Sequence, residues 1–132
     1  MKVLKFGGSS VGDAERIRSV IGIIAHSKNA NGQIAVVASA MQGVTNQLVE
    51  ASRLAFRGER RYEDLLKELE SRHVKVADEL LGKDGSSHSR HFIPQAFQEL
   101  RDFIHGIWIL GELTNRTLDY VMSYGERLSC TI

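Results

Sequence analysis

The sequence contains little cysteine or proline and no long apolar segment. Among its 132 residues, Cys130 is the only cysteine and Pro94 the only proline. A single cysteine excludes an internal disulfide and is typical of a reducing compartment, and we interpret Cys130 as a buried, small apolar side chain. No apolar run approaches the ~18 residues of a membrane span, and the strand-like start leaves no room for a leader peptide. We therefore expect a soluble, cytoplasmic protein.

An excess of charge of one sign is also missing. The 17 lysine and arginine residues and the 16 aspartate and glutamate residues leave a formal net charge of +1. Binding to nucleic acid or to an anionic membrane would call for a strongly basic surface, so we expect neither partner. The five histidines show no metal-ligand spacing, and no histidine stands in a nucleophile–base arrangement. The sequence thus predicts no metal site and no triad-type hydrolase.

The first forty residues have the pattern of a strand–helix–strand unit. Residues 3–6 read as a strand, and apolar residues at helical spacing predict a helix over 11–26, capped by Ser9 or Ser10. Residues 34–38 are apolar throughout, as in a parallel strand that is buried on both faces. This order predicts a right-handed βαβ crossover.

The rest of the chain is mostly helical. Four further helices are expected. The first covers 44–58 and the second 62–80, which ends at Gly82 and is followed by a polar loop at 82–91. The third has Pro94 in its first turn, and the fourth is capped by Thr114 and reaches residue 132. Two strands are fewer than an open parallel sheet needs. The chain therefore reads as the first part of a longer α/β domain.

The first candidate site is the stretch "KFGGSS" at residues 5–10. Alternation along the strand places Lys5 on the face opposite Leu4 and Phe6, near the carboxyl end where α/β sheets bind ligands. Gly7 and Gly8 leave backbone amides accessible, and a following helix would direct its positive end toward an anion. The stretch is neither a Walker A loop nor a dinucleotide fingerprint. It indicates a phosphate site, although an exposed lysine before an ordinary tight turn is the alternative.

Two more polar stretches are candidates. Residues 39–46, "SAMQGVTN", follow the second strand, so Ser39 is expected beside the two glycines and Thr45 at the start of the next helix. The alternative is that Thr45 or Asn46 is a plain helix cap and that Ser39 is only a small residue at the end of the strand. In "SYGERLS", residues 123–129, Gly125 suggests close approach by another backbone, and Glu126 follows it as a carboxylate for a ligand. Glu126 could equally be a surface charge paired with Arg127 or Arg116.

Together, "KFGGSS", "VVASAMQGVTNQL" (36–48) and "SYGERLS" resemble the signatures of aspartate kinases, and the resemblance extends over all 132 residues. It implies an α/β amino-acid kinase fold, an αβα sandwich with a mainly parallel sheet, of which residues 1–132 are the N-terminal portion. The stretch "IHGIWILGEL" at 104–113 is more similar to the bifunctional aspartokinase–homoserine dehydrogenase branch. The family usually has threonine where Ser9 stands, and serine keeps the hydroxyl.

The resemblance also implies a function. ATP, with Mg²⁺, would phosphorylate the side-chain carboxylate of L-aspartate, and the enzyme would be a homo-oligomer. The implied contacts with the phosphoryl group are Lys5, which is also catalytic, together with Gly7, Gly8 and Ser9. The implied aspartate contacts are Ser39, Thr45 and Glu126. The family's catalytic aspartate and nucleotide pocket lie beyond residue 132, so we expect this chain to be inactive by itself.

Phosphorylation of a carboxylate is consistent with the absence of a nucleophile–base arrangement from the sequence. A carboxylate is already ionised at neutral pH and needs no general base, but two anions must be brought together among positive charges and amides. Kinases of glutamate, acetylglutamate, carbamate or a nucleotide, within the same fold, are the nearest enzymatic alternatives. A ligand-sensing or interaction module without catalytic activity, derived from such a kinase, is the alternative from another class.

Overall fold

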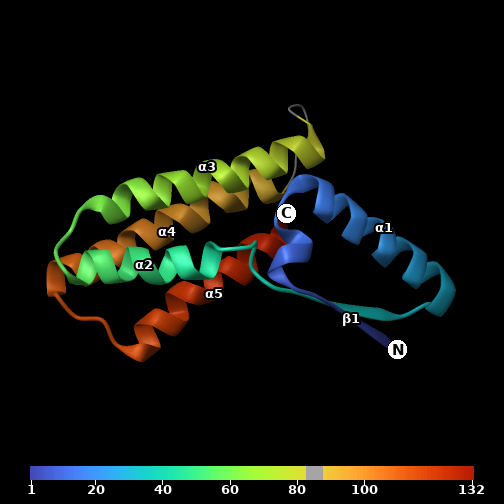
Figure 1. Ribbon diagram of the computed structural model, residues 1–132, viewed down its shortest axis with the longest axis horizontal. Coiled ribbons are helices and arrows are strands. Elements are labelled where there is room, and N and C mark those ends of the chain that lie inside the picture. Colours follow the sequence, from blue (N-terminus) through green and yellow to red (C-terminus); the bar gives the residue numbers. More distant parts are fainter. Residues whose placement is uncertain (83–87) are drawn as a thin grey trace.

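The computed structural model describes residues 1–82 and 88–132, which form an α/β fold in two parts (Figure 1). The elements in chain order are β1 (Lys2–Phe6), the short 3₁₀ turn η1 (Gly8–Val11), α1 (Ala14–Asn31), β2 (Ile34–Ala38), α2 (Val44–Phe56), α3 (Arg61–Leu81), α4 (His88–Leu110) and α5 (Asn115–Thr131). One part is the βαβ unit made by β1, α1 and β2. The other is a bundle of α2, α3, α4 and α5. The predicted α/β class is confirmed.

The βαβ unit has the predicted parallel pairing. Leu4 is in register with Val36, and Phe6 with Ala38. These residues face α1, because Phe6, Val36 and Ala38 line a common apolar pocket with Ile17 and other residues of that helix. Lys5 lies in register with Val37 on the opposite face. The alternation of side chains in β1 therefore confirms the predicted orientation of the lysine.

The start of the first helix differs from the prediction. Neither Ser9 nor Ser10 caps α1, since both belong to η1. The cap is Asp13, whose carboxylate accepts a hydrogen bond of 2.9 Å from the backbone N–H of Arg16. A carboxylate satisfies a free amide and also interacts favourably with the helix dipole, so it is a better cap at this position.

The second strand is less buried than its composition predicts. Val36 and Val37 are 43% and 49% exposed. A parallel strand is buried on both faces only when helices cover both, and among the described residues α1 covers one face. The expectation of a strand buried on both sides is therefore wrong for this chain.

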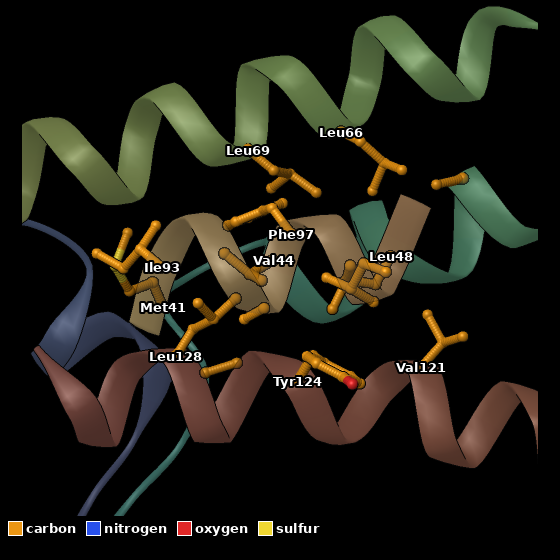
Figure 2. Close-up of a cluster of buried hydrophobic side chains, with 14 of the residues drawn as sticks. Met41, Val44, Leu48, Leu66, Leu69, Ile93, Phe97, Val121, Tyr124 and Leu128 are labelled. Atoms are coloured by element: carbon orange, nitrogen blue, oxygen red, sulfur yellow. The ribbon is translucent and has the colours of Figure 1, made fainter. Parts of the chain in front are cut away.

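The helical bundle contains the main core, in which side chains from all four helices converge (Figure 2). The fully buried side chains include Val44, Leu48, Leu66, Leu69, Ile93, Phe97, Leu100, Val121, Tyr124 and Leu128. They recur at helical spacing on each helix, which is the reason the sequence pattern could identify these segments.

The beginning of α4 is the largest difference from the predicted helices. The helix starts at His88, so the predicted loop at 82–91 is wrong from His88 onward, and residues 83–87 lie outside the described residues. Pro94 stands inside the helix rather than in its first turn. Residues on both sides of Pro94 are buried, and the Ser89 hydroxyl donates to the Thr131 carbonyl oxygen at 2.9 Å. Packing on α5 thus extends the helix upstream of a residue that usually marks a helix start.

Two predicted helix limits are confirmed. Gly82 follows α3 with a positive φ of 71° and donates its N–H to the Asp78 carbonyl oxygen. Thr114 caps α5, since its hydroxyl accepts from the N–H of Thr117 at 3.1 Å. Both residues satisfy backbone groups that a helix end leaves without a partner.

Cys130 is not buried, contrary to our interpretation. It is exposed, and its Sγ lies 3.9 Å from the Ala38 carbonyl oxygen. In the last turn of α5, Cys130 lies beside the end of β2 and borders the apolar pocket between the strands and α1. Within residues 1–82 and 88–132, no helix has both the length and the apolar character to cross a membrane.

Candidate phosphate and amino-acid site

The carboxyl ends of β1 and β2 bring the first two candidate stretches together. The N–H of Ser39 donates to the Phe6 carbonyl oxygen at 3.0 Å. A Cβ atom on Gly8 would lie only 2.9 Å from the Ala40 carbonyl oxygen, so only glycine allows this approach. The two segments that follow the strands, residues 7–12 and 39–43, are therefore in direct contact, as the parallel pairing predicts. We call them the glycine loop and the serine loop.

Lys5 lies at the edge of this junction with its side chain exposed. None of the described carboxylates forms an ion pair with it. A Cβ on Gly7 would meet no atom within 4 Å, so the backbone at Gly7 is open to a ligand. The lysine ammonium and the accessible backbone next to it can both interact with an anion.

The helix dipole behind the glycine loop is not arranged as predicted. Residues Gly8–Val11 form only a short 3₁₀ turn, in which the N–H of Ser10 donates to the Gly7 carbonyl oxygen at 2.9 Å. The amino terminus of α1 comes later, and the Asp13 carboxylate already occupies it. The positive end of α1 is therefore not available to an anion at Gly7 and Gly8.

The helix with an available amino terminus is α2. Its cap residue is Gly43, with φ of 83°, and in the described part of the chain no side chain makes a capping hydrogen bond there. Thr45 is half-buried in that turn and is not the cap, so the alternative role for Thr45 is wrong. No acidic residue stands in the first turn of α2. This end of α2 can therefore stabilise a carboxylate or phosphate.

The third stretch contacts the serine loop from α5. A Cβ on Gly125 would lie 2.7 Å from the Cβ of Ala40 and 3.7 Å from Oγ1 of Thr45. The close approach predicted for Gly125 is present, but side chains rather than backbone are the nearest neighbours. The Ser129 hydroxyl also donates to the Ser39 carbonyl oxygen at 2.6 Å. All three stretches therefore meet at the junction between the βαβ unit and the bundle.

Glu126 follows Gly125 and has an exposed side chain. Neither of the pairs that the alternative invoked, with Arg127 or with Arg116, is among the ion pairs of the described residues. Arg127 instead lies over the ring of Tyr124, with its guanidinium carbon 4.3 Å from the ring centre. Glu126 thus has no partner among the described residues that would neutralise it.

A hydrogen bond between Tyr124 and Glu99 joins α5 to α4, two residues before Glu126 in the sequence. The hydroxyl of the buried Tyr124 donates to Oε2 of Glu99 at 2.6 Å. This hydrogen bond lowers the pKa of the Glu99 carboxyl. Burial is the main reason that the pKa of Tyr124 is raised, and the bond to Glu99 adds to it, so the phenol remains protonated. A protonated Tyr124 can keep donating throughout the neutral range.

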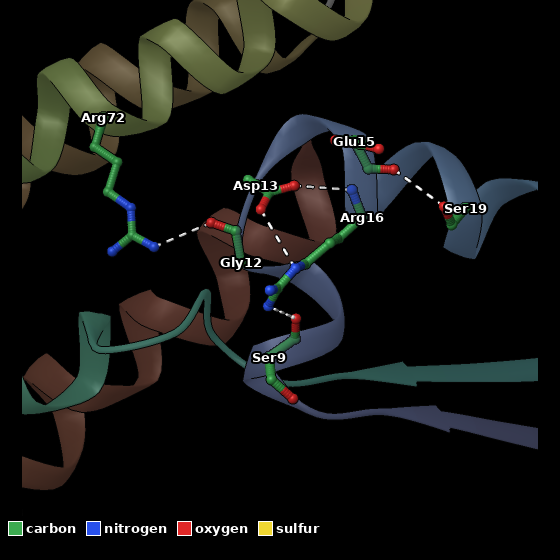
Figure 3. A network of polar contacts seen from close by, with 7 residues as sticks. All are labelled: Ser9, Gly12, Asp13, Glu15, Arg16, Ser19 and Arg72. Carbon is green, nitrogen blue, oxygen red and sulfur yellow. Dashed lines mark hydrogen bonds and ion pairs between the residues drawn. The ribbon is translucent and has the colours of Figure 1, made fainter.

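Sequence reasoning missed Arg72, which lies on α3 and is half-buried. Its guanidinium donates to the carbonyl oxygen of Gln42 in the serine loop at 2.8 Å. It also donates to that of Gly12 in the glycine loop at 3.1 Å (Figure 3). Arg16 similarly donates to the Ser9 carbonyl oxygen at 2.7 Å. No signal in the sequence distinguishes Arg72 from the solvated charges on the outer face of the same helix.

Metal ligands are not grouped in this part of the molecule. Within the described ranges, no three histidine, cysteine, aspartate or glutamate side chains are placed so that they could hold an ion together. The glycine loop, the serine loop and the start of α2 present hydroxyls, backbone amides and the Lys5 ammonium, and Glu126 is the carboxylate that the third stretch adds. The groups of the two loops suit an anion better than a cation.

The sequence profile of the amino acid kinase family matches residues 1–132. The chain belongs to the amino acid kinase family. This match covers every candidate site residue and confirms the fold that the three motifs implied.

Several curated proteins that the chain is similar to are named aspartokinases. The chain is 31% identical to the aspartokinase of Candida albicans over 97% of the chain, and 38% identical to the chloroplastic aspartokinase 1 of Arabidopsis thaliana over 98%. It is also 30% identical over its whole length to the bifunctional aspartokinase/homoserine dehydrogenase of Buchnera aphidicola. The chain spans 24%, 22% and 16% of these three proteins. The similarity confirms the resemblance to aspartate kinases.

Solved structures of aspartokinases have the same fold. Escherichia coli aspartokinase III in complex with aspartate and ADP superposes with a TM-score of 0.79, covering 98% of this chain and 27% of that protein at 22% identity. The aspartate kinase of Clostridium acetobutylicum gives a TM-score of 0.69. The arrangement of this chain, with its small parallel sheet and its helices, is therefore that of the corresponding portion of the family fold.

Proposed function

We propose that residues 1–132 are the N-terminal portion of the catalytic domain of an aspartate kinase, which transfers the γ-phosphoryl group of ATP to the side-chain carboxylate of L-aspartate. The observation that carries this proposal is the convergence of the three aspartokinase-like stretches at one junction. Gly8 contacts Ala40, and Gly125 contacts Ala40 and Thr45. Residues more than a hundred positions apart in sequence thus form one surface.

In this proposal the glycine loop and Lys5 interact with the phosphoryl group. Lys5 is exposed and has no carboxylate partner among the described residues, so its charge is available to the substrate. Gly7 leaves the backbone open, and Ser9 adds a hydroxyl. As the phosphoryl group moves, negative charge accumulates on its oxygens, and a fixed ammonium and backbone amides lower the energy of that state.

Ser39, Thr45 and Glu126 would bind aspartate. The uncapped amino terminus of α2 is suited to a carboxylate of the substrate, next to the Thr45 hydroxyl. Glu126, next to Gly125 in the sequence, is an exposed carboxylate without an ion-pair partner among the described residues, and it is suited to the substrate's ammonium group. The chain thus offers partners of the correct sign for both ends of an amino acid.

The nucleotide would bring Mg²⁺ with it. No group of three metal ligands occurs among the described residues, and the junction residues do not form a cation site by themselves. The ion would neutralise phosphate charge when bound. Holding the nucleotide and its metal belongs, in this proposal, to residues outside this chain.

The proposal concerns a longer enzyme, because the chain spans about a quarter or less of the curated relatives named above. We expect residues 1–132 alone to be inactive. Monofunctional and bifunctional relatives both match, so the bifunctional branch stays a prediction, as do the homo-oligomeric state and the cytoplasmic location. The alternative, a ligand-sensing or interaction module without catalysis, requires that the longer protein lack kinase activity.

Substitution of Lys5 tests the proposed function. In the longer kinase that contains this chain, Lys5→Ala is expected to lower kcat by about 10²–10³-fold, as for loss of one preorganised donor, and to change the KM for aspartate much less. Lys2→Ala is the matched control, because Lys2 is an exposed lysine at the other end of the same strand. A coupled ADP-release assay gives both constants. If kcat of Lys5→Ala stays within a few-fold of the parent, the assignment of Lys5 fails.

A further inference from the structure

We propose that Arg72 is a positioning residue that holds the glycine loop and the serine loop at a fixed separation. The inference rests on the proposed function, in which one loop interacts with the phosphoryl group and the other with aspartate. Arg72 belongs to neither loop. It reaches the junction from α3, an element that carries none of the candidate substrate contacts (Figure 3).

The guanidinium of Arg72 bonds one carbonyl oxygen in each loop. Nη1 donates to Gln42 at 2.8 Å, and Nη2 donates to Gly12 at 3.1 Å. Gly12 is the last residue of the glycine loop, and Gln42 stands two residues before the start of α2. The planar fork of arginine keeps its donors in a fixed geometry, so two simultaneous bonds restrict the distance between the two carbonyl groups.

The helix that carries Arg72 cannot easily shift. Leu69 and His73, on either side of Arg72, are at most 1% exposed in the bundle core. The bundle therefore determines the position of the Arg72 backbone, and the side chain transmits that position to both loops. The direct contact of Gly8 with Ala40 joins the loops at a second point.

Arg72 also keeps its positive charge available. Both of its described bonds are to backbone carbonyl groups, and no described carboxylate forms an ion pair with it. The charge of the guanidinium therefore adds to the positive potential near the glycine loop. A lysine at position 72 would preserve the charge but could not hold two separated carbonyl groups in the same way. This difference separates positioning from a purely electrostatic role.

Loss of this link is expected to affect turnover more than binding. Each loop can still bind its own substrate, but a misplacement of about 1 Å between two reactants can cost about 10²-fold in rate. In the longer kinase we expect Arg72→Ala to lower kcat by about 10–10²-fold on that ground, with much smaller changes in the KM values for ATP and aspartate. Arg72→Lys should recover only part of the loss.

The matched control is Arg101→Ala. Arg101 lies on α4 and pairs with Glu70 on α3, so its loss removes an arginine contact of the same helix without touching either loop. Arg101→Ala should leave kcat within a few-fold of the parent. The positioning role is wrong if Arg72→Ala has no larger effect on kcat than Arg101→Ala, or if Arg72→Lys restores kcat fully.

Hydrogen exchange in the same proteins provides a readout that needs no turnover. Arg72→Ala should speed exchange at the amides of Ser10 and Val44. The Ser10 N–H donates to the Gly7 carbonyl oxygen in the glycine loop, and the Val44 N–H donates to the Met41 carbonyl oxygen in the serine loop. Arg101→Ala should not. Unchanged exchange at both amides overturns the inference. If the parent protein shows no aspartate kinase activity, the proposed function fails, while the exchange rates still decide whether Arg72 holds the two loops.

Discussion

The βαβ unit and the helical bundle are similar in their apolar content but differ in how much of it they bury. In the bundle, large side chains such as Phe97 and Leu100 are completely buried. In the βαβ unit, Val3 of β1 is 60% exposed and Val37 of β2 is 49% exposed. The core of the bundle lies between four helices, whereas among the described residues α1 covers only one face of the two-stranded sheet. An apolar pattern therefore identifies a buried face only where a partner for that face is present.

The candidate site lies where the two regions meet. The βαβ unit contributes Lys5 and the glycine loop, while α2 and α5 of the bundle contribute Thr45 and Glu126. The serine loop connects the regions. The bundle is fully packed and the sheet is less buried, so the relative position of the two halves of the candidate site depends on contacts at their junction, which include those made by Gly8, Gly125, Ser129 and Arg72.

The largest expected effect comes from core truncation in the two regions. Phe97→Ala should lower the free energy of unfolding by about 3–5 kcal/mol, because it removes a fully buried aromatic side chain and leaves a cavity. Val37→Ala should change it by no more than about 0.5 kcal/mol, because that side chain is half-exposed. Chemical denaturation of the two variants measures both values. Equal losses would mean that the sheet is as well packed as the bundle and would remove the contrast.

A smaller effect is expected where the regions meet. Gly125→Ala places a Cβ 2.7 Å from the Cβ of Ala40, so the backbone must move, at a cost of about 1–3 kcal/mol. Gly106→Ala is the matched control, since it is also a glycine inside a helix but has no atom within 4 Å of the added Cβ. It should stabilise the protein by up to about 1 kcal/mol. Thermal or chemical unfolding that shows Gly125→Ala to be neutral would contradict the close contact.

The smallest expected effect is a pH dependence within the bundle. His73 is completely buried, and burial lowers the pKa of its imidazole below the ordinary value of 6.5. Its Nδ1–H donates to the Leu69 carbonyl oxygen at 2.7 Å, while Nε2 has no partner in the described part of the chain. The unfolded chain then binds a proton more readily than the folded one. Stability should be complete above about pH 6.5 and should fall as the pH drops below it.

His73→Leu tests this origin of the pH dependence. Removal of the imidazole should flatten the fall of unfolding free energy between neutral and mildly acidic pH. His26→Gln is the control, because His26 is exposed on α1 and its loss should leave the slope unchanged. Denaturant titrations at a series of pH values give the slopes. A slope that is as steep in His73→Leu as in the parent would assign the pH dependence to other groups.

Most elements could be predicted from the sequence because their signals are local. The helical spacing of Leu48, Leu69 and Leu128 reflects a buried stripe on each helix, and Thr114 and Gly82 carry the chemistry of helix ends. The predicted helix limits are wrong where packing against distant segments overrides the local preference of the residues. Helix α4 continues past Pro94 because Ser89 and Ile93 pack against the bundle, and no residue near Pro94 could indicate that.

The three motifs could likewise be identified from the sequence, since the residues of each motif are contiguous. The composition, the parallel βαβ order and the membership in the amino acid kinase family follow from the order of the residues alone. Only the tertiary structure decided that the dipole of α2 rather than α1 is available at the site, and that Arg72 joins the two loops. The first depends on which side chain occupies each helix end, and the second depends on hydrogen bonds between segments 30 and 60 residues apart. Such contacts form when the bundle and the sheet pack together, and the chain carries no local pattern for them.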